Sequence, residues 1–126
     1  MKQSITSKNA PAAIGPYSQA VKAGSFIFLS GQLGINPKTG EFVEGAVSEQ
    51  AEQVFKNIKA VLSEADSDFD QVVKKTVFLA DMADFAAMNT VYAKYFKEPY
   101  PARSAIAVRT LPKNALVEIE VIAEVK

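Results

Sequence analysis

The chain has 126 residues, of which 48% are apolar, and its 14 basic and 14 acidic side chains give no net charge at pH 7. This composition predicts a single globular domain over residues 1–126, and the absence of a basic patch argues against a nucleic-acid partner. The sequence contains neither cysteine nor histidine, which excludes thiol nucleophiles, disulfides, zinc sites and imidazole acid–base chemistry.

The N-terminal segment lacks the apolar core of a signal peptide, and no stretch of the chain is long enough to span a bilayer. We therefore expect a cytoplasmic protein without a membrane partner. Residues 2–6 predict a short edge strand, and the prolines and glycine within residues 9–19 predict a rigid, irregular loop. Such a loop can deliver the polar tip of Tyr17 to a defined point, although a tyrosine there serves equally well to pack its ring.

A hairpin is predicted around Lys22-Ala23-Gly24. Its second strand is apolar on both faces at Phe26–Leu29, which indicates burial on both sides. This strand ends in the polar triplet Ser30-Gly31-Gln32. Site residues often lie at such a strand end, but turn residues are needed there in any case.

Two later segments have the apolar spacing of amphipathic helices, and a strand at Val72–Ala80 separates them. We expect Ser48 to cap the first helix, which ends near Asp66, and Asp81 to precede the second. The apolar positions of the first helix are Ala51, Val54, Phe55, Ile58, Val61, Leu62 and Ala65. Those of the second are Phe85, Met88, Tyr92, Tyr95 and Phe96.

Arg103 lies in an otherwise apolar run that predicts a strand. Because side chains alternate between the faces of a strand, Arg103 shares its face with Ala105 and Ala107, whose small side chains leave space beside the guanidinium. The planar guanidinium fork binds a carboxylate or phosphate at two points. An arginine that pairs with a glutamate of a neighbouring strand is the more common arrangement, so both interpretations stay open.

The last strand, from Leu116 to Val125, places Glu118 and Glu120 on one face. A carboxylate near a partly desolvated cleft can act as a base or orient a water molecule. A solvated or ion-paired strand face is the more common role for such a pair.

The elements follow in the order of three strands, a helix, a strand, a helix and two strands, which is an α+β pattern with both helices on one face of the sheet. Several strands are apolar on both faces, so the second face needs a cover that this short chain does not supply. A partner subunit is the simplest cover, and we therefore expect a homo-oligomer.

Four segments taken together resemble the RidA/YjgF family of reactive-intermediate imine deaminases: residues 10–19, Ser30-Gly31-Gln32, Pro101-Ala102-Arg103-Ser104 and Val117-Glu118-Ile119-Glu120. The resemblance runs over the whole chain. It implies a chorismate-mutase-like α+β fold and a homotrimer with a ligand cleft at each subunit interface. It also implies cofactor-free hydrolysis of 2-imino acids (2-iminobutanoate, 2-iminopropanoate), made by serine/threonine dehydratases, to 2-keto acids and ammonia.

The same resemblance implies roles for individual residues. Arg103 falls on the position that binds the substrate carboxylate, and Glu118 on the position near the attacking water. The pocket-lining positions of the family are those of Tyr17, Ser30 and Asn89. Tyr17 can also hydrogen-bond the substrate or relay a proton. Ala105 lies where many relatives carry a cysteine, so this chain has no thiol at that part of the pocket.

The family also includes members described as ribonucleases, translation inhibitors, purine regulators and chaperones. The alternative function is therefore a non-catalytic regulatory or chaperone-like protein, or an endoribonuclease. The absence of histidine and of a basic patch is unfavourable for a ribonuclease. Retention of Arg103 favours the deaminase.

Overall fold

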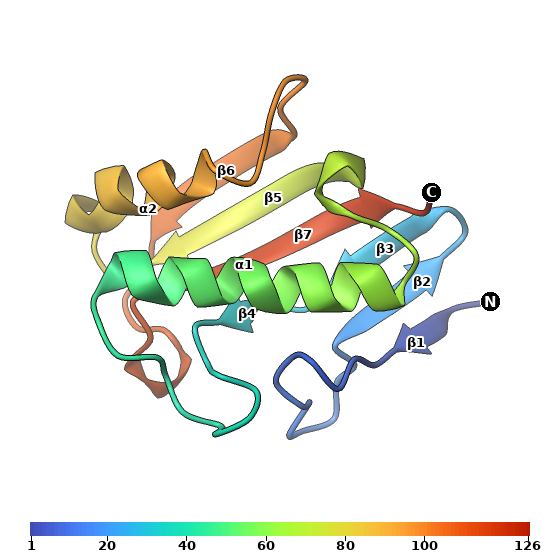
Figure 1. Cartoon of the computed structure of the whole chain (residues 1–126), viewed down its shortest axis with the longest axis horizontal. Coiled ribbons are helices and arrows are strands. Elements are labelled where there is room, and N and C mark those ends of the chain that lie inside the picture. The colour runs from blue at the N-terminus through green and yellow to red at the C-terminus, as the bar shows by residue number, and fades with distance from the viewer.

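The computed structural model of the chain describes residues 1–126 and contains a seven-stranded mixed sheet with two helices on one face (Figure 1). The strands are β1 (Gln3–Ile5), β2 (Ala20–Ala23), β3 (Phe26–Leu29), β4 (Gln32–Leu33), β5 (Val72–Leu79), β6 (Ala102–Ala107) and β7 (Val117–Glu124). The helices are α1 (Val47–Glu64) and α2 (Phe85–Tyr92), and short 3-10 turns lie at Phe69–Gln71, Met82–Asp84 and Pro112–Asn114. The predicted α+β class is confirmed.

The strands lie in the order β1-β2-β3-β7-β5-β6, and β4 pairs with β7 beyond the end of β3. The pairing of β5 with β6 is parallel, and the other pairings are antiparallel. The C-terminal strand β7 therefore lies inside the sheet, whereas β6, which carries Arg103, is an edge strand. The strand β5 lies between β6, which carries Arg103, and β7, which carries Glu118.

All seven apolar positions predicted for the first helix are buried, six of them within α1 and the last, Ala65, at its C-cap. The prediction that Ser48 caps this helix is wrong. The N-cap is Ala46, two residues before Ser48, and the helix begins at Val47; the Glu49 carboxylate in its first turn accepts a hydrogen bond of 2.8 Å from the Ala46 N–H. Ser48 therefore lies within the first turn.

Helix α2 is shorter than its apolar pattern, because it ends at Tyr92 and leaves Tyr95 and Phe96 in the following turns. These aromatic rings still pack together around Phe55 of α1. Its centroid lies 6.0 Å from Tyr92, 4.8 Å from Tyr95 and 5.8 Å from Phe96. The aromatic cluster holds α2 and the turns behind it against α1.

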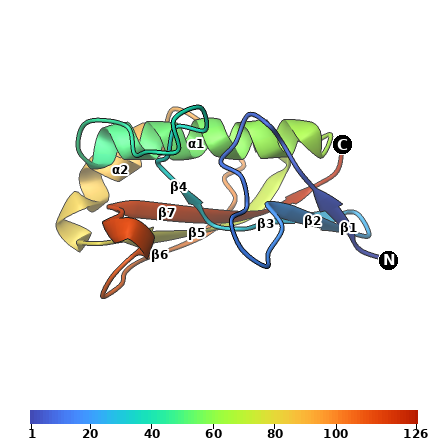
Figure 2. The same ribbon diagram turned by 90° about the horizontal axis from the view of Figure 1, so that it is seen from below.

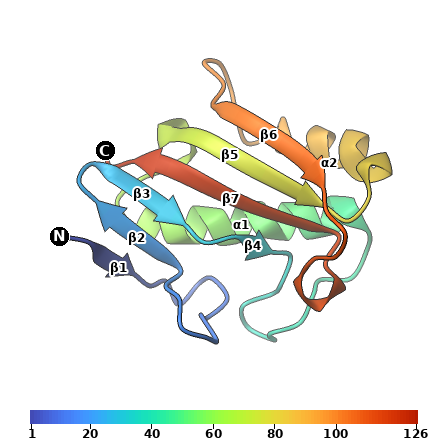
Figure 3. The ribbon, with the colours of Figure 1, turned by 180° about the vertical axis from the view of Figure 1, so that it is seen from behind.

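Only one face of the sheet is covered by helices (Figure 2). In β3, Ile27 and Leu29 point to that covered face and are buried, whereas Phe26 and Phe28 are 41% and 43% exposed. Burial of this strand on both sides is thus not found within one chain. The uncovered face, toward the viewer in Figure 3, also carries Ile106, which is 48% exposed. A subunit that covers this apolar face stays a prediction.

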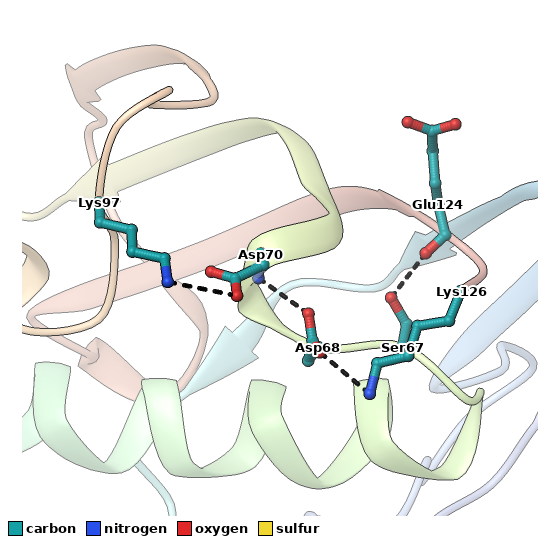
Figure 4. Close-up of polar contacts among 6 residues, drawn as sticks. All are labelled: Ser67, Asp68, Asp70, Lys97, Glu124 and Lys126. Atoms are coloured by element: carbon teal, nitrogen blue, oxygen red, sulfur yellow. Dashed lines mark hydrogen bonds and ion pairs between the residues drawn. The ribbon is translucent and has the colours of Figure 1, made fainter.

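The C-terminal end of β7 is attached to the turn that follows α1 (Figure 4). Ser67 Oγ donates a 2.6 Å hydrogen bond to the Glu124 carbonyl, and Lys126 Nζ lies 3.0 Å from an Asp68 carboxylate oxygen. The hydrogen bond fixes the far end of the central strand to the helical layer, whereas the exposed ion pair adds little. Neither helix is long and apolar enough to cross a membrane.

Asn57 holds the loop after β4 against α1. It is fully buried, and its Nδ2 donates to the carbonyls of Leu33 and Ile35 at 3.0 and 2.9 Å. Asn57→Ala would leave both carbonyls without this partner. We expect the free energy of unfolding in urea to fall by roughly 2–4 kcal/mol.

The matched control is Asn36→Ala, which removes an exposed side-chain contact with the Lys38 N–H in the same loop. It should cost less than about 1 kcal/mol. Equal losses in the two variants would contradict this role of Asn57.

Candidate functional site

Arg103 lies on the face of the sheet that the helices cover. In the parallel pairing of β6 with β5, Arg103 is the neighbour of Lys75, and Ala105 is the neighbour of Val77. Lys75 and Val77 are both buried beneath the helices. The predicted alternation along β6 is confirmed, and Ala105 lies beside Arg103 on the same face.

The guanidinium of Arg103 is held by α2. Its Nη1 donates a 2.6 Å hydrogen bond to Asn89 Oδ1, and its Cζ lies 5.2 and 4.7 Å from the ring centroids of Phe85 and Tyr92. No carboxylate pairs with Arg103, since the three ion pairs of the chain join other residues. The pairing with a strand glutamate is therefore wrong, and the exposed guanidinium keeps donors free for an anion.

A second group of predicted residues lies around a hollow of about 740 Å³. Its walls are the loop at residues 11–19, the segment from Ser30 to Gly40, the turn at Pro112–Lys113 and the side chains of Glu118 and Glu120 on β7. Tyr17, Ser30 and Glu118 all line this hollow. The structure therefore brings these three residues together.

The loop that carries Tyr17 is fixed by the buried amide of Gln19. Gln19 Oε1 accepts a 2.6 Å hydrogen bond from the Ser7 N–H, and its Nε2 donates to the Ser7 and Pro11 carbonyls at 3.1 and 2.8 Å. Ser30 Oγ donates to the Ser18 carbonyl at 2.6 Å. Ser30 thus holds the loop, while the Tyr17 side chain is left 52% exposed at the edge of the hollow.

Glu118 is half-buried on the uncovered face of β7, and its environment depends on Gly31. A Cβ at Gly31 would come within 2.8 Å of Glu118 Cδ, so a larger residue at this point would displace the carboxylate from its observed position. Removal from water, followed by repulsion from Glu120, raises the pKa of Glu118. The group is therefore a stronger base than an ordinary glutamate, and the sequence alone gave no signal for the contact with Gly31.

The two groups of residues lie on opposite faces of the sheet. Arg103 contacts α2 on the covered face, whereas Glu118 neighbours Phe78 on the uncovered face. The sheet itself separates them, so within one chain the candidate residues form two separate groups. One contains Arg103, Asn89 and Ala105, and the other contains Tyr17, Ser30 and Glu118.

The sequence matches the family model described as "Endoribonuclease L-PSP" over residues 7–125. The chain belongs to this family. Members that bear RidA and RutC names match it as well, so the predicted RidA/YjgF membership is confirmed. A RutC family protein of Pyrococcus horikoshii is 56% identical over 123 residues, which are 98% of each chain.

Two further members carry information on ligands. The 2-iminobutanoate/2-iminopropanoate deaminase of Capra hircus is 51% identical over 98% of this chain and 90% of its own length. The crystal structure of E. coli TdcF with bound serine superimposes with a TM-score of 0.92 at 42% identity and covers 98% of this chain and 99% of that one. The family thus contains imine deaminases and a protein that binds a small amino acid.

The raised pKa of Glu118 predicts a pH-dependent stability. Between the ordinary glutamate pKa of about 4.3 and the raised folded value, the folded protein binds more protons than the unfolded chain, so the free energy of unfolding falls as pH rises through this window. Glu118→Gln removes this loss. The midpoint of its urea unfolding should lie at a higher urea concentration than that of the wild type at pH 7. Near pH 4 the two midpoints should be equal.

Glu124→Gln, at an exposed position on the same face of β7, is the matched control and should follow the wild type at both pH values. A wild-type midpoint at pH 7 for Glu118→Gln would argue that burial of this carboxylate costs nothing.

Proposed function

We propose that this protein hydrolyses reactive 2-imino acids, such as 2-iminobutanoate and 2-iminopropanoate, to 2-keto acids and ammonia. The observation that carries the proposal is the unpaired guanidinium of Arg103, which Asn89 and two aromatic rings orient and no carboxylate neutralises. Such a group is suited to the carboxylate of a small acid. The deaminase name of a relative 51% identical to this chain supports the same reaction.

The complete site is formed between two copies of the chain, in a homotrimer with three such clefts. The group around Arg103 and the group around Glu118 lie on opposite faces of one sheet, so a second copy of the chain supplies the group that one cleft lacks. The apolar side chains on the uncovered face, among them Phe28 and Ile106, support contact with another subunit. Such a head-to-tail contact closes into a symmetric ring when the rotation between neighbouring subunits is a third of a turn, as in the proposed trimer.

Within this cleft, Arg103 binds the substrate carboxylate, and Asn89 acts as a positioning residue that holds the guanidinium. Ala105 leaves room for the substrate beside Arg103. Glu118 of the second subunit orients the attacking water and accepts its proton, which its raised pKa favours. The hydroxyl of Tyr17 hydrogen-bonds the reacting nitrogen, and Ser30 keeps the Tyr17 loop in place.

The reaction proceeds through a carbinolamine. A water oxygen adds to the carbon of the protonated C=N bond, the π electrons move to nitrogen, and the water gives one proton to the Glu118 carboxylate. Glu118 returns this proton to the amino nitrogen, the C–N bond breaks to release ammonia, and the regenerated Glu118 carboxylate accepts the hydroxyl proton as the C=O bond of the keto acid forms. The steps transfer protons, add one water molecule and release one ammonia molecule, without any change of oxidation state. The reaction therefore needs no cofactor and no thiol at Ala105.

The alternative inferred from the sequence is a ribonuclease or a regulatory, chaperone-like protein. The family description as an endoribonuclease is the observation that favours it. The chain has no histidine and no net positive charge, which gives less support to RNA cleavage than to imine hydrolysis. An RNA or client effect that survives in Arg103→Ala would belong to a separate activity.

A coupled assay tests the proposed reaction. A serine/threonine dehydratase releases the 2-imino acid from its amino acid, semicarbazide traps it, and this protein competes for it. We expect semicarbazone formation to fall, and keto acid and ammonia to appear, in proportion to the protein added. Unchanged trapping at a protein concentration in excess of the dehydratase would contradict the proposal.

Arg103 variants test the carboxylate contact. Arg103→Ala should lower kcat/KM roughly 10²-fold or more and abolish measurable binding of 2-oxobutanoate, because two charge-assisted hydrogen bonds are lost. Arg103→Lys keeps the charge but loses the fork, so it should also be impaired. Isothermal titration calorimetry measures the binding. The control is Arg109→Ala, an exposed arginine beyond the end of β6, and wild-type affinity in Arg103→Ala would refute the contact.

Mixed oligomers test the shared cleft. Arg103→Ala and Glu118→Gln should each be inactive alone. After the two chains are unfolded and refolded together in equal amounts, about a quarter of the clefts would combine an intact Arg103 with an intact Glu118. Activity should therefore return to about a quarter of the wild-type value. A mixture as inactive as its components, with trimers confirmed by sedimentation, would place both residues in one chain's site.

A further inference from the structure

Lys75 is a buried lysine without a polar partner. Its side chain on β5 points under the helices and is 0% exposed, and its Nζ forms no hydrogen bond. It takes part in none of the ion pairs of the chain. A charged amine in such a place is costly, so an apolar side chain would serve the core better. The proposed reaction gives Lys75 no role so far.

Aromatic rings and one arginine surround the amine. Nζ lies 3.6 Å from the centroid of the Tyr92 ring and 3.1 Å from that of Phe96. Arg103, the neighbour of Lys75 on β6, packs its guanidinium 4.7 Å from the centroid of the same Tyr92 ring. The two basic side chains therefore share one aromatic ring.

Few charged groups face Lys75 from the elements around it. Arg103 faces it from β6 and the Tyr92 phenol from α2, while β7 presents the apolar Val121 as its strand neighbour and α1 contributes Phe55 to the same cluster. Burial, with a further contribution from Arg103, lowers the pKa of Lys75 to about 6. Burial also raises the pKa of Tyr92, which keeps the phenol uncharged. The protein alone thus holds one cation here, Arg103, beside an amine that is mostly neutral at pH 7.

A bound carboxylate changes this balance. Its negative charge offsets that of Arg103 and removes the repulsion that disfavours a second cation, while the two ring faces remain available to an ammonium group. We propose that Lys75 is a positioning residue that takes up a proton when an anionic carboxylate binds Arg103, so that ligand binding and proton binding are coupled. This inference rests on the proposed function only through the carboxylate contact of Arg103.

Thermodynamic linkage fixes the sign of the effect. If the carboxylate favours the protonated amine, protonation must favour the carboxylate by the same factor. Affinity for 2-oxobutanoate should therefore rise as pH falls from 8 toward 5.5, a range in which the ligand itself stays anionic. A coupling factor near 10 predicts a Kd that falls by roughly 5- to 10-fold over this range.

The experiment is calorimetric titration of the whole protein with 2-oxobutanoate between pH 5.5 and 8, in buffers of different ionisation enthalpy. The wild type should take up protons on binding. Lys75→Met keeps the length of the side chain but cannot titrate. This variant should therefore bind 2-oxobutanoate with a smaller pH dependence, and the Lys75 share of the proton uptake should be absent. Because the pKa of Glu118 is also raised by burial, Glu118→Gln isolates the contribution of Lys75 and should keep the Lys75 share of the proton uptake.

Lys59→Met, on the exposed face of α1, is the control and should match the wild type. A pH dependence of Kd that is the same in Lys75→Met and in the wild type would overturn the inference while leaving the Arg103 contact intact. Binding that Arg103→Ala does not weaken would overturn the proposed function as well.

Direct titration of the Lys75 amine by NMR gives a second test that needs no substitution at this position. The pKa of its Nζ should rise when 2-oxobutanoate saturates the site, and it should rise without ligand in Arg103→Gln, which removes the neighbouring cation. A pKa that neither change moves would refute the coupling.

Discussion

The alternation of side chains across a sheet that is covered on one face is the constraint on which this structure depends. In β7, Val117, Ile119 and Val121 face the helices, so Glu118 must face away from them. In β6, Arg103 is the strand neighbour of the buried Lys75, so its side chain lies on the same face of the sheet and points toward α2. The same alternation that builds the core therefore separates an arginine from a glutamate that one reaction would need together. In the proposed oligomer, a second subunit brings the two side chains together without any rearrangement of the chain.

The aromatic cluster between the helices links stability to the candidate site. Tyr92 packs against Phe55 in the core and also lies beside the guanidinium of Arg103 and the amine of Lys75. A single ring thus contacts the hydrophobic core and both basic side chains. Substitutions at Tyr92 would consequently disturb folding and ligand binding together. A variant at this position therefore cannot distinguish an effect on stability from an effect on binding.

Buried amides give the irregular segments their fixed shape. Gln19 holds the loop of Tyr17, Asn57 holds the loop after β4, and Gln50 accepts a 3.0 Å hydrogen bond from the Leu116 N–H just before β7. The first two loops form walls of the hollow beside Glu118. Hydrogen bonds to the backbone replace regular secondary structure here, because the segments have too few strand partners of their own.

The sequence by itself determined the α+β class, the helical stripe of α1 and the faces of β6 and β7, because these follow from local periodicity. Family motifs pointed to the site residues. Only the tertiary structure decided that Asn89, not a glutamate, holds Arg103, that Gly31 makes room for Glu118, and that Lys75 is buried without a partner. Each of these depends on contacts between elements distant in the chain, and periodicity within one element carries no information on which other element it meets.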